Sequence, residues 1–199
     1  TIPEGVTSIG DHAFYECSSL TAITLPEGVT SIGEDAFYYC SSLTAITLPE
    51  SVTSIGDYAF VYCSSLTAIT LPEGVTSIGW SAFEDCSSLT TILLPKSVSY
   101  IDYNTFADCP ELLDVYCNAE TVPSAELDAF EGSCIEHATL YVPANAVASY
   151  KTTAPWSSFG TILPLDGDQP AEEGWSEWNH LGTAVTASGK ESMIATFQY

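Results

Sequence analysis

Residues 24–46 read TLPEGVTSIGEDAFYYCSSLTAI, and this stretch of 23 residues decides the fold because the chain repeats it. Close copies occupy residues 1–23, 47–69 and 70–92. A worn fifth copy covers 93–115, and an irregular sixth copy continues from Tyr116 to about Leu140. A fixed period of this length is typical of solenoids, because one coil can bury its apolar residues only against a neighbouring coil.

Each copy contains the residues for two short strands and one turn. Leu20–Leu25 alternates inward and outward positions and ends at Pro26, which predicts a short strand in a parallel stack. Val29–Ile32 predicts a second extended piece, and Asp35–Cys40 predicts one helical turn. We therefore predict a repeat solenoid with short parallel strands and one helical turn per coil, the coils lying about 4.8 Å apart.

One phenylalanine and one cysteine recur at fixed positions in the copies. We expect the phenylalanines to stack inside the coils: Phe14, Phe37, Phe60, Phe83 and Phe106. The cysteines are expected to form a buried column of reduced thiols, because parallel Cβ vectors suit a disulfide poorly: Cys17, Cys40, Cys63, Cys86 and Cys109. Cys117 and Cys134 are the one plausible disulfide pair, although core packing is their expected role.

The residues from Leu20 to Leu43 follow the order L-x-x-I-x-L-P-x-x-V-x-x-I-G-x-x-A-F-x-x-C-x-x-L. This order closely resembles the 23-residue, Treponema-type repeat of BspA-like leucine-rich-repeat proteins of bacterial surfaces. The resemblance covers residues 1 to about 140. It implies a leucine-rich-repeat solenoid, a secreted or cell-surface location and an adhesin-like binding function.

The segment after the repeats is expected to close the array. Asn145 is placed to cap a short helix from Ala146 to about Thr152. The apolar residues that would cover the last coil are Val147, Tyr150, Trp156 and Phe159. The solenoid of about six coils is therefore assigned to residues 1–163, with its cap at 141–163.

The composition changes after the cap. Residues 164–174 read as a polar linker, and 175–199 as the start of a β-rich segment that the chain cuts short. Within that segment, 183–187 and 193–199 resemble the two strands of a hairpin.

The charge of the chain excludes two classes of partner. Three lysines and no arginine stand against 26 acidic residues, which gives a formal net charge of -23. Such a chain repels phosphate backbones and anionic lipid, so we expect no nucleic-acid binding and no direct membrane insertion of this segment. The expected partner is an extracellular protein, which could be a host protein with a basic surface.

The residues give no reason to expect catalysis. The histidines are scattered, and none has a Ser or Cys partner in a recognisable nucleophile motif: His12, His137 and His180. The cysteines lack the short local spacing of a zinc site. We predict no enzymatic activity, no cofactor, no metal and no catalytic residue.

Two pairs of positions flanking the Ala-Phe of each copy vary while the rest of the copy is constant. In copies one to four these positions carry tyrosine, tryptophan and acids, and they are expected to lie along one edge of the solenoid. The protein-binding candidates are Tyr15, Tyr38, Tyr39, Tyr58, Tyr62 and Trp80. The alternative interpretation is surface drift, with the array acting as a rigid spacer that presents a downstream domain and binds no ligand of its own.

Overall fold

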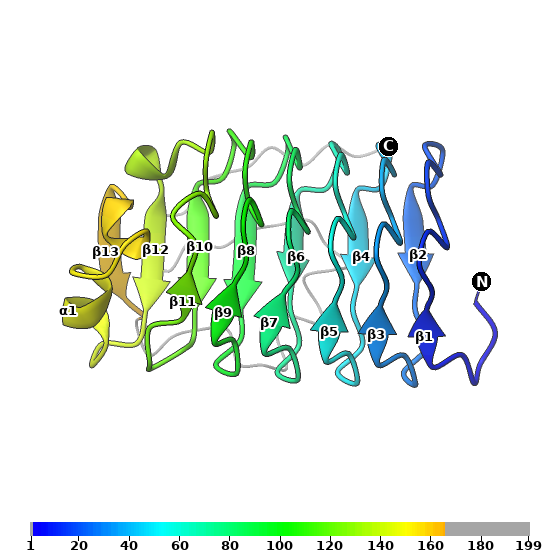
Figure 1. Ribbon diagram of the computed structural model, residues 1–199, viewed down its shortest axis with the longest axis horizontal. Helices are drawn as coiled ribbons and strands as arrows, with labels where there is room; N and C mark the ends of the chain where they lie inside the picture. The colour runs from blue at the N-terminus through cyan, green and yellow to red at the C-terminus, as the bar shows by residue number, and fades with distance from the viewer. Residues whose placement is uncertain (1, 166–199) are drawn as a thin grey trace, which may run out of the picture. The chain divides into compact units, whose positions relative to one another are not determined.

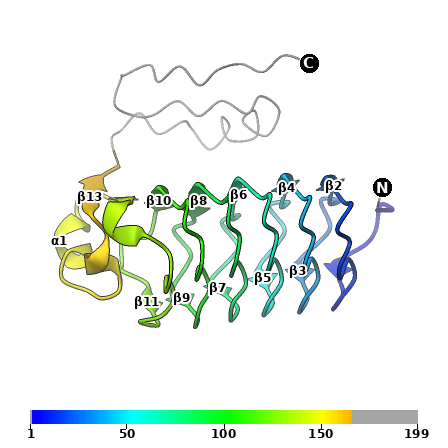
Figure 2. The same cartoon turned by 90° about the horizontal axis from the view of Figure 1, so that it is seen from above.

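The computed structural model describes residues 2–165, and in that range the chain winds into a stack of coils with two columns of parallel strands. The first column is a six-stranded sheet of one short strand per coil: β1 (Ser8–Ile9), β3 (Ser31–Ile32), β5 (Ser54–Ile55), β7 (Ser77–Ile78), β9 (Tyr100–Ile101) and β11 (Ser124–Ala125). The second column follows in the same order: β2 (Ala22–Thr24), β4 (Ala45–Thr47), β6 (Ala68–Thr70), β8 (Thr91–Leu94), β10 (Asp114–Cys117), β12 (Thr139–Val142) and β13 (Thr161–Pro164). Figures 1 and 2 show the two columns on different sides of the stack.

The strands pair in the register of the sequence repeat. Ile32 lies opposite Ile55, and Ile46 lies opposite Ile23, each exactly one copy away. Because every residue meets its own equivalent, the alternation of inward isoleucine and outward threonine is the same in successive coils. Both predicted strands of the coil are therefore confirmed.

The segment predicted as one helical turn is a series of tight turns rather than a helix. Tyr38 N–H donates to Asp35 C=O within its own coil at 3.1 Å, as in a single helical turn. The next residue breaks that pattern, because Tyr39 has φ 56° and its N–H donates at 2.8 Å to Val61 C=O of the following coil. A left-handed residue cannot continue a right-handed helix, so the backbone forms a third ladder between coils instead.

The N–H groups of this third ladder donate to the following coil, whereas those after the first strand column donate to the preceding coil. In the turns, Phe37 N–H donates forward to Ala59 C=O at 2.8 Å, whereas Gly33 N–H donates backward to Ile9 C=O at 2.8 Å. Consecutive coils are therefore joined by hydrogen bonds on every side, which satisfies turn groups that would otherwise need water.

The interior is the predicted column of aromatic rings. Phe37 and Phe60 are fully buried, with ring centroids 5.1 Å apart and an angle of 6° between the planes. The column continues through Phe83 and Phe106, and the irregular sixth coil extends it with Phe130. Phe14 stacks on Phe37 at 5.1 Å but is only partly buried, because no coil precedes its own in the described residues.

The cysteine column is confirmed for four of its five members. Cys40, Cys63, Cys86 and Cys109 are buried free thiols, and each lies within 3.2–3.3 Å of the phenylalanine carbonyl of the preceding coil. The prediction is wrong for Cys17, which is exposed. Cys17 belongs to the first coil of the described residues, so another coil covers it on one side only.

The cap closes the far end of the stack (Figure 1). Its helices are α1 (Val147–Tyr150) and η2 (Trp156–Ser158), and a further short helix, η1 (Ile135–His137), precedes β12. Tyr150 and Trp156 are fully buried, and the Trp156 ring meets Phe130 edge-on at 5.7 Å. Trp156 Nε1 also donates to the Pro123 carbonyl at 2.9 Å, so the cap is fixed by a directional bond as well as by packing.

Two predictions about the cap are wrong. Ala146, not Asn145, is the N-cap residue of α1, and no side chain caps this helix. The chain is already turned there by the Ala146 N–H bond to Pro143 C=O at 2.8 Å, and α1 ends at Tyr150, before Thr152. The predicted core packing of Cys117 and Cys134 is also wrong for one of the two.

Cys117 is buried 3.1 Å from the Tyr150 hydroxyl, whereas Cys134 is exposed, and both are free thiols. Nearly all of the predicted linker and the whole segment 175–199 lie outside the described residues. No helix in residues 2–165 is long and apolar enough to cross a membrane.

Candidate functional site

The candidate site is the outward surface of the tight turns, which we call the variable edge. It comprises four positions per coil, two before the Ala-Phe pair and two after it. In the first four coils these are Asp11, His12, Tyr15, Glu16, Glu34, Asp35, Tyr38, Tyr39, Asp57, Tyr58, Val61, Tyr62, Trp80, Ser81, Glu84 and Asp85. The inward Ala and Phe hold the backbone from inside, so a packed scaffold presents these side chains, apart from Val61 and Ser81, which are buried.

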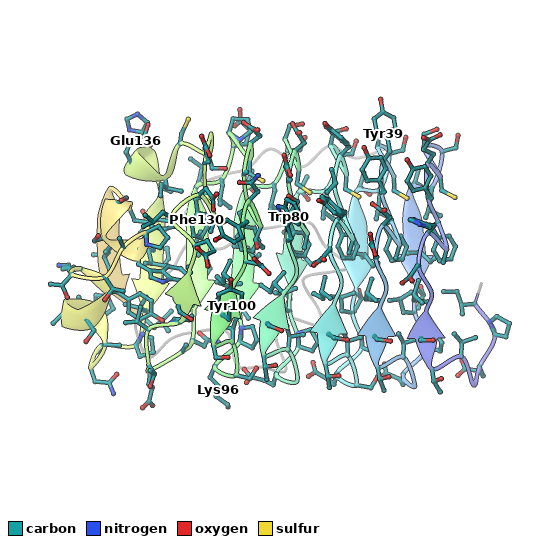
Figure 3. The ribbon with its side chains drawn as sticks, viewed as in Figure 1. Tyr39, Trp80, Lys96, Tyr100, Phe130 and Glu136 are labelled. Atoms are coloured by element: carbon teal, nitrogen blue, oxygen red, sulfur yellow. The ribbon has the colours of Figure 1, made fainter. Side chains whose placement is uncertain are left out.

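Four of the predicted binding residues form one aromatic cluster, aromatic patch A. Tyr15 stacks on Tyr38 at 4.9 Å with 5° between the planes. The rings of Tyr38 and Tyr39 both meet the Tyr62 ring edge-on, with centroids 5.7 Å apart. Tyr39 is 47% exposed and projects beyond the ribbon in Figure 3.

The other two predicted residues form a separate cluster, aromatic patch B. The Tyr58 and Trp80 rings lie 5.4 Å apart at 43°, and Trp80 is 46% exposed. Tyr103 occupies the Trp80 position of the next coil and is 49% exposed. Leu127 occupies it in the sixth coil and is 79% exposed. The six predicted residues therefore belong to two patches.

Sequence reasoning missed Tyr103 and Leu127 because it compared only the four regular copies. The signal was nevertheless present: aligning the worn fifth and sixth copies on Phe106 and Phe130 places both residues at the Trp80 position. The alignment predicts the column that a residue belongs to, which is the relevant property in a stacked array.

The backbone of the variable edge is held in the left-handed region at two of its four positions. Non-glycine residues with positive φ in the described chain all lie there: His12, Glu16, Asp35, Tyr39, Tyr58, Tyr62, Ser81, Asp85, Asn104 and Asp108. Asn, Asp and His tolerate this conformation best, and other side chains pay about 1–2 kcal/mol for it. Tyr39, Tyr58 and Tyr62 are thus placed where a smaller polar residue would be less strained.

Carboxylates surround both aromatic patches. The pKa of Tyr58 is raised by partial burial and then by the charges of Asp57 and Glu84. The pKa of Tyr62 is raised first by Asp85 and then by partial burial. Burial and the nearby Asp108 raise the pKa of Asp85 itself. The edge is therefore both aromatic and strongly negative.

Each histidine of the described residues lies beside a carboxylate. His12 Nδ1 lies 3.3 Å from Asp35 on the edge, and His137 Nε2 lies 3.8 Å from Glu136. Glu84, Asp85 and Asp108 each place an oxygen within 4.8 Å of the others, close enough to share a cation. Exposed acids converge in this way on many surfaces, so the grouping by itself assigns no metal.

The outer face of the second strand column is the other surface of the coils. In the first coils it is small and flat, since Ala45 and Thr47 of β4 are exposed and repeat the residues of β2. Further along it becomes aromatic, where Tyr116 and Tyr141 stack at 4.6 Å. Burial raises the pKa of Tyr116 and of the neighbouring Asp114.

Comparison with known proteins places these coils in a family. A BspA-type leucine-rich-repeat region, in six copies, matches residues 1–113 and 32–150. A leucine-rich-repeat protein of T. pallidum is 39% identical, with a TM-score of 0.55 over 57% of this chain and 54% of that one. No curated protein matches the chain.

Two further solved structures support the fold at lower identity. The pneumococcal vaccine antigen PcpA is 20% identical, with a TM-score of 0.61 over 82% of this chain and 40% of that one. A leucine-rich-repeat protein of Eubacterium ventriosum is 20% identical, with a TM-score of 0.54 over 81% of this chain and 54% of that one. The chain thus spans about half or less of each of these three proteins. Its repeat, its coil geometry and the family match agree: the chain belongs to the BspA-type leucine-rich-repeat family.

Proposed function

We propose that this chain is a non-enzymatic protein-binding module of the adhesin type, which binds an extracellular protein through the variable edge. The family match supports a repeat module for protein interaction, and the finer role is our proposal. The six residues that we assign to the contact are Tyr15, Tyr38, Tyr39, Tyr58, Tyr62 and Trp80.

The observation that carries the proposal is the conformation of three exposed or half-exposed tyrosines. Tyr39, Tyr58 and Tyr62 have φ between 56° and 58°, a strained region for an aromatic residue. Unselected drift at these positions favours Asp, Asn or Gly, which adopt that backbone at lower cost. Retention of large aromatics there, with Trp80 beside them, favours a role in contact with a partner.

Charge supports the choice of partner. A chain with net charge -23 attracts proteins with basic surfaces and accelerates their encounter. Tyrosine and tryptophan give large contact area with few rotatable bonds, which suits protein recognition. We therefore propose a partner with a basic surface, which could be a host protein.

The proposed location is the cell surface or the extracellular medium. One structural relative, PcpA, is described as a pneumococcal vaccine antigen. A location outside the cell is our proposal for this chain.

A rigid spacer is the competing function, since a regular rod needs no ligand. The first strand column favours it because it is one six-stranded sheet, although the second column divides into a sheet of β2 and β4 and a sheet from β6 to β13. Capture of host extracellular proteins by the full chain separates the two functions. The test variant combines Tyr38→Ala, Tyr58→Ala and Trp80→Ala, and the matched control combines Thr24→Ala, Thr47→Ala and Thr70→Ala on the outer strand face.

If the edge binds, the aromatic variant loses the captured protein while remaining folded, with about 2 kcal/mol lost per central hot spot. The threonine variant retains it. Equal capture by the wild type and the aromatic variant would refute the edge, and loss in the threonine variant would move the site to the strand face.

A further inference from the structure

The two aromatic patches and the acids of the variable edge form a crossed arrangement. After Ala-Phe, the positions are aromatic in the early coils and acidic later, running from Tyr38 and Tyr39 to Glu84 and Asp85. Before Ala-Phe the order is reversed, running from Glu34 and Asp35 to Trp80. The exchange happens in the third coil, which carries both Tyr58 and Tyr62.

The acidic residues therefore form two patches, which lie on opposite sides of the aromatic residues. Acidic patch A precedes Ala-Phe in coils one to three: Asp11, Glu34, Asp35 and Asp57. Acidic patch B follows Ala-Phe in coils four to six: Glu84, Asp85, Asp108 and Glu131. Aromatic patches A and B lie on the other diagonal, and they come closest in the third coil.

Ring contacts place the third coil between the two aromatic patches, because Tyr62 meets the Tyr38 ring and Tyr58 meets the Trp80 ring. Partial burial raises the pKa of Tyr58, and the charges of both acidic patches add to it, from Asp57 on one side and Glu84 on the other. The pKa of Tyr62 is raised first by the charge of Asp85. The aromatic residues therefore form a diagonal band with carboxylates on both flanks.

Among the described residues, these carboxylates have few basic side chains near them. Within residues 2–165 the ion pairs of the variable edge reduce to His12 with Asp35, at 3.3 Å. Glu84, Asp85 and Asp108 lie within 4.8 Å of one another with no basic side chain between them in the described chain. Ionised carboxylates at that distance repel one another, and a cationic group placed beside them would reduce that repulsion.

We propose that the variable edge binds a protein segment with an apolar row flanked on both sides by Arg or Lys, laid diagonally across coils one to five. The apolar row covers aromatic patches A and B, and the cations reach the two acidic patches. Arginine fits best, because its planar guanidinium stacks on tyrosine and also pairs with a carboxylate. The inference rests on the proposed function and specifies the partner of that same edge.

The test is selection of a random 12-residue peptide library, displayed on phage, against the full chain. Peptides with an aromatic or aliphatic centre and Arg or Lys on both sides are expected. The charge variant combines Glu84→Gln, Asp85→Asn and Asp108→Asn. The matched control combines Glu27→Gln, Glu50→Gln and Glu111→Gln, three exposed acids outside the edge that change the net charge equally.

Binding of a selected peptide should fall at least about tenfold in the charge variant and less than about twofold in the control, and it should weaken with salt. If binding falls equally in both variants, the peptide is attracted to acidic proteins in general, and the proposal is overturned. Enrichment of neutral peptides, or a selection that enriches no peptide, also overturns it. Neutral peptides that are lost in the aromatic variant would still leave the proposed function standing. Selected peptides that bind the aromatic variant as tightly as the wild type contradict both the proposed function and this inference.

Discussion

The interior column and the variable edge arise from the same tight turn yet obey opposite rules. Phe37 faces inward and is fully buried, whereas its chain neighbours Tyr38 and Tyr39 face outward. Stacking distances are nearly equal, 5.1 Å for Phe37 on Phe60 and 4.9 Å for Tyr15 on Tyr38. The difference is that the inner rings repeat in every coil and the outer rings do not. Packing therefore dictates the inner residue, and the outer residues are open to selection for contact.

Thiol labelling gives the largest contrast between inside and outside. Native protein should label rapidly at Cys17 and Cys134, because these two of the seven cysteines are exposed. Cys40, Cys63, Cys86, Cys109 and Cys117 are buried and should react only when the coils open, slower by a factor on the order of 10³ or more. Mass spectrometry of timed labelling measures this. Fast labelling of Cys63 in the folded protein contradicts a packed interior.

Truncation inside the column should cost the most stability. Phe60→Ala removes a ring that is stacked on both sides by Phe37 and Phe83, so the free energy of unfolding should fall by about 3–5 kcal/mol. Urea denaturation followed by circular dichroism measures the change. Phe60→Leu, which keeps most of the apolar volume, is the control and should lose clearly less. A loss below about 1 kcal/mol in Phe60→Ala would show that the coils do not depend on the column.

Alkaline pH should weaken the interior before the edge. Burial raises the pKa of Cys40 to about 11, whereas the same thiol in the unfolded chain ionises near 9. The neutral Cys40 thiol makes its full contribution to the free energy of unfolding below about pH 9. That contribution is lost as the pH rises toward 11, and the free energy of unfolding falls by about 3 kcal/mol in all. Denaturation at pH 8, 9, 10 and 11 should show a shallower decline for Cys40→Ala than for the wild type. Parallel curves would mean that Cys40 does not contribute.

Strain at the edge predicts the smallest effect. Tyr39→Asn relieves the backbone strain of a tyrosine in the left-handed conformation. Tyr38→Asn removes a half-buried ring from a residue without positive φ, so it relieves no such strain. The Tyr39 variant should therefore be more stable than the Tyr38 variant by about 1 kcal/mol. Thermal melting of the two proteins side by side measures the difference. Equal stability would remove strain as an argument for function at this edge.

The sequence by itself determined the fold class, the register and the interior. A 23-residue repeat places Ile46 against Ile23 and Phe60 against Phe37 without any knowledge of the coil path, because stacked copies must align like with like. It also predicted Val147, Tyr150, Trp156 and Phe159 as the closing residues, of which the last three are buried and Val147 is partly buried. The errors at single residues, such as Cys17 and Asn145, lie where the repeat ends, whereas the expected helical turn proved to be a series of tight turns in the regular coils as well.

Tertiary structure alone decided how the variable edge is organised. The period states which residues share a column but not which columns meet across a turn, so it could not show that Tyr38 touches Tyr62 while Tyr58 touches Trp80. The left-handed backbone of Tyr39 was equally hidden, because tyrosine carries no local preference for that conformation. It is set by the ladder between coils, in which the Tyr39 N–H must reach Val61 C=O, and such a bond between separate coils exists only in the assembled stack.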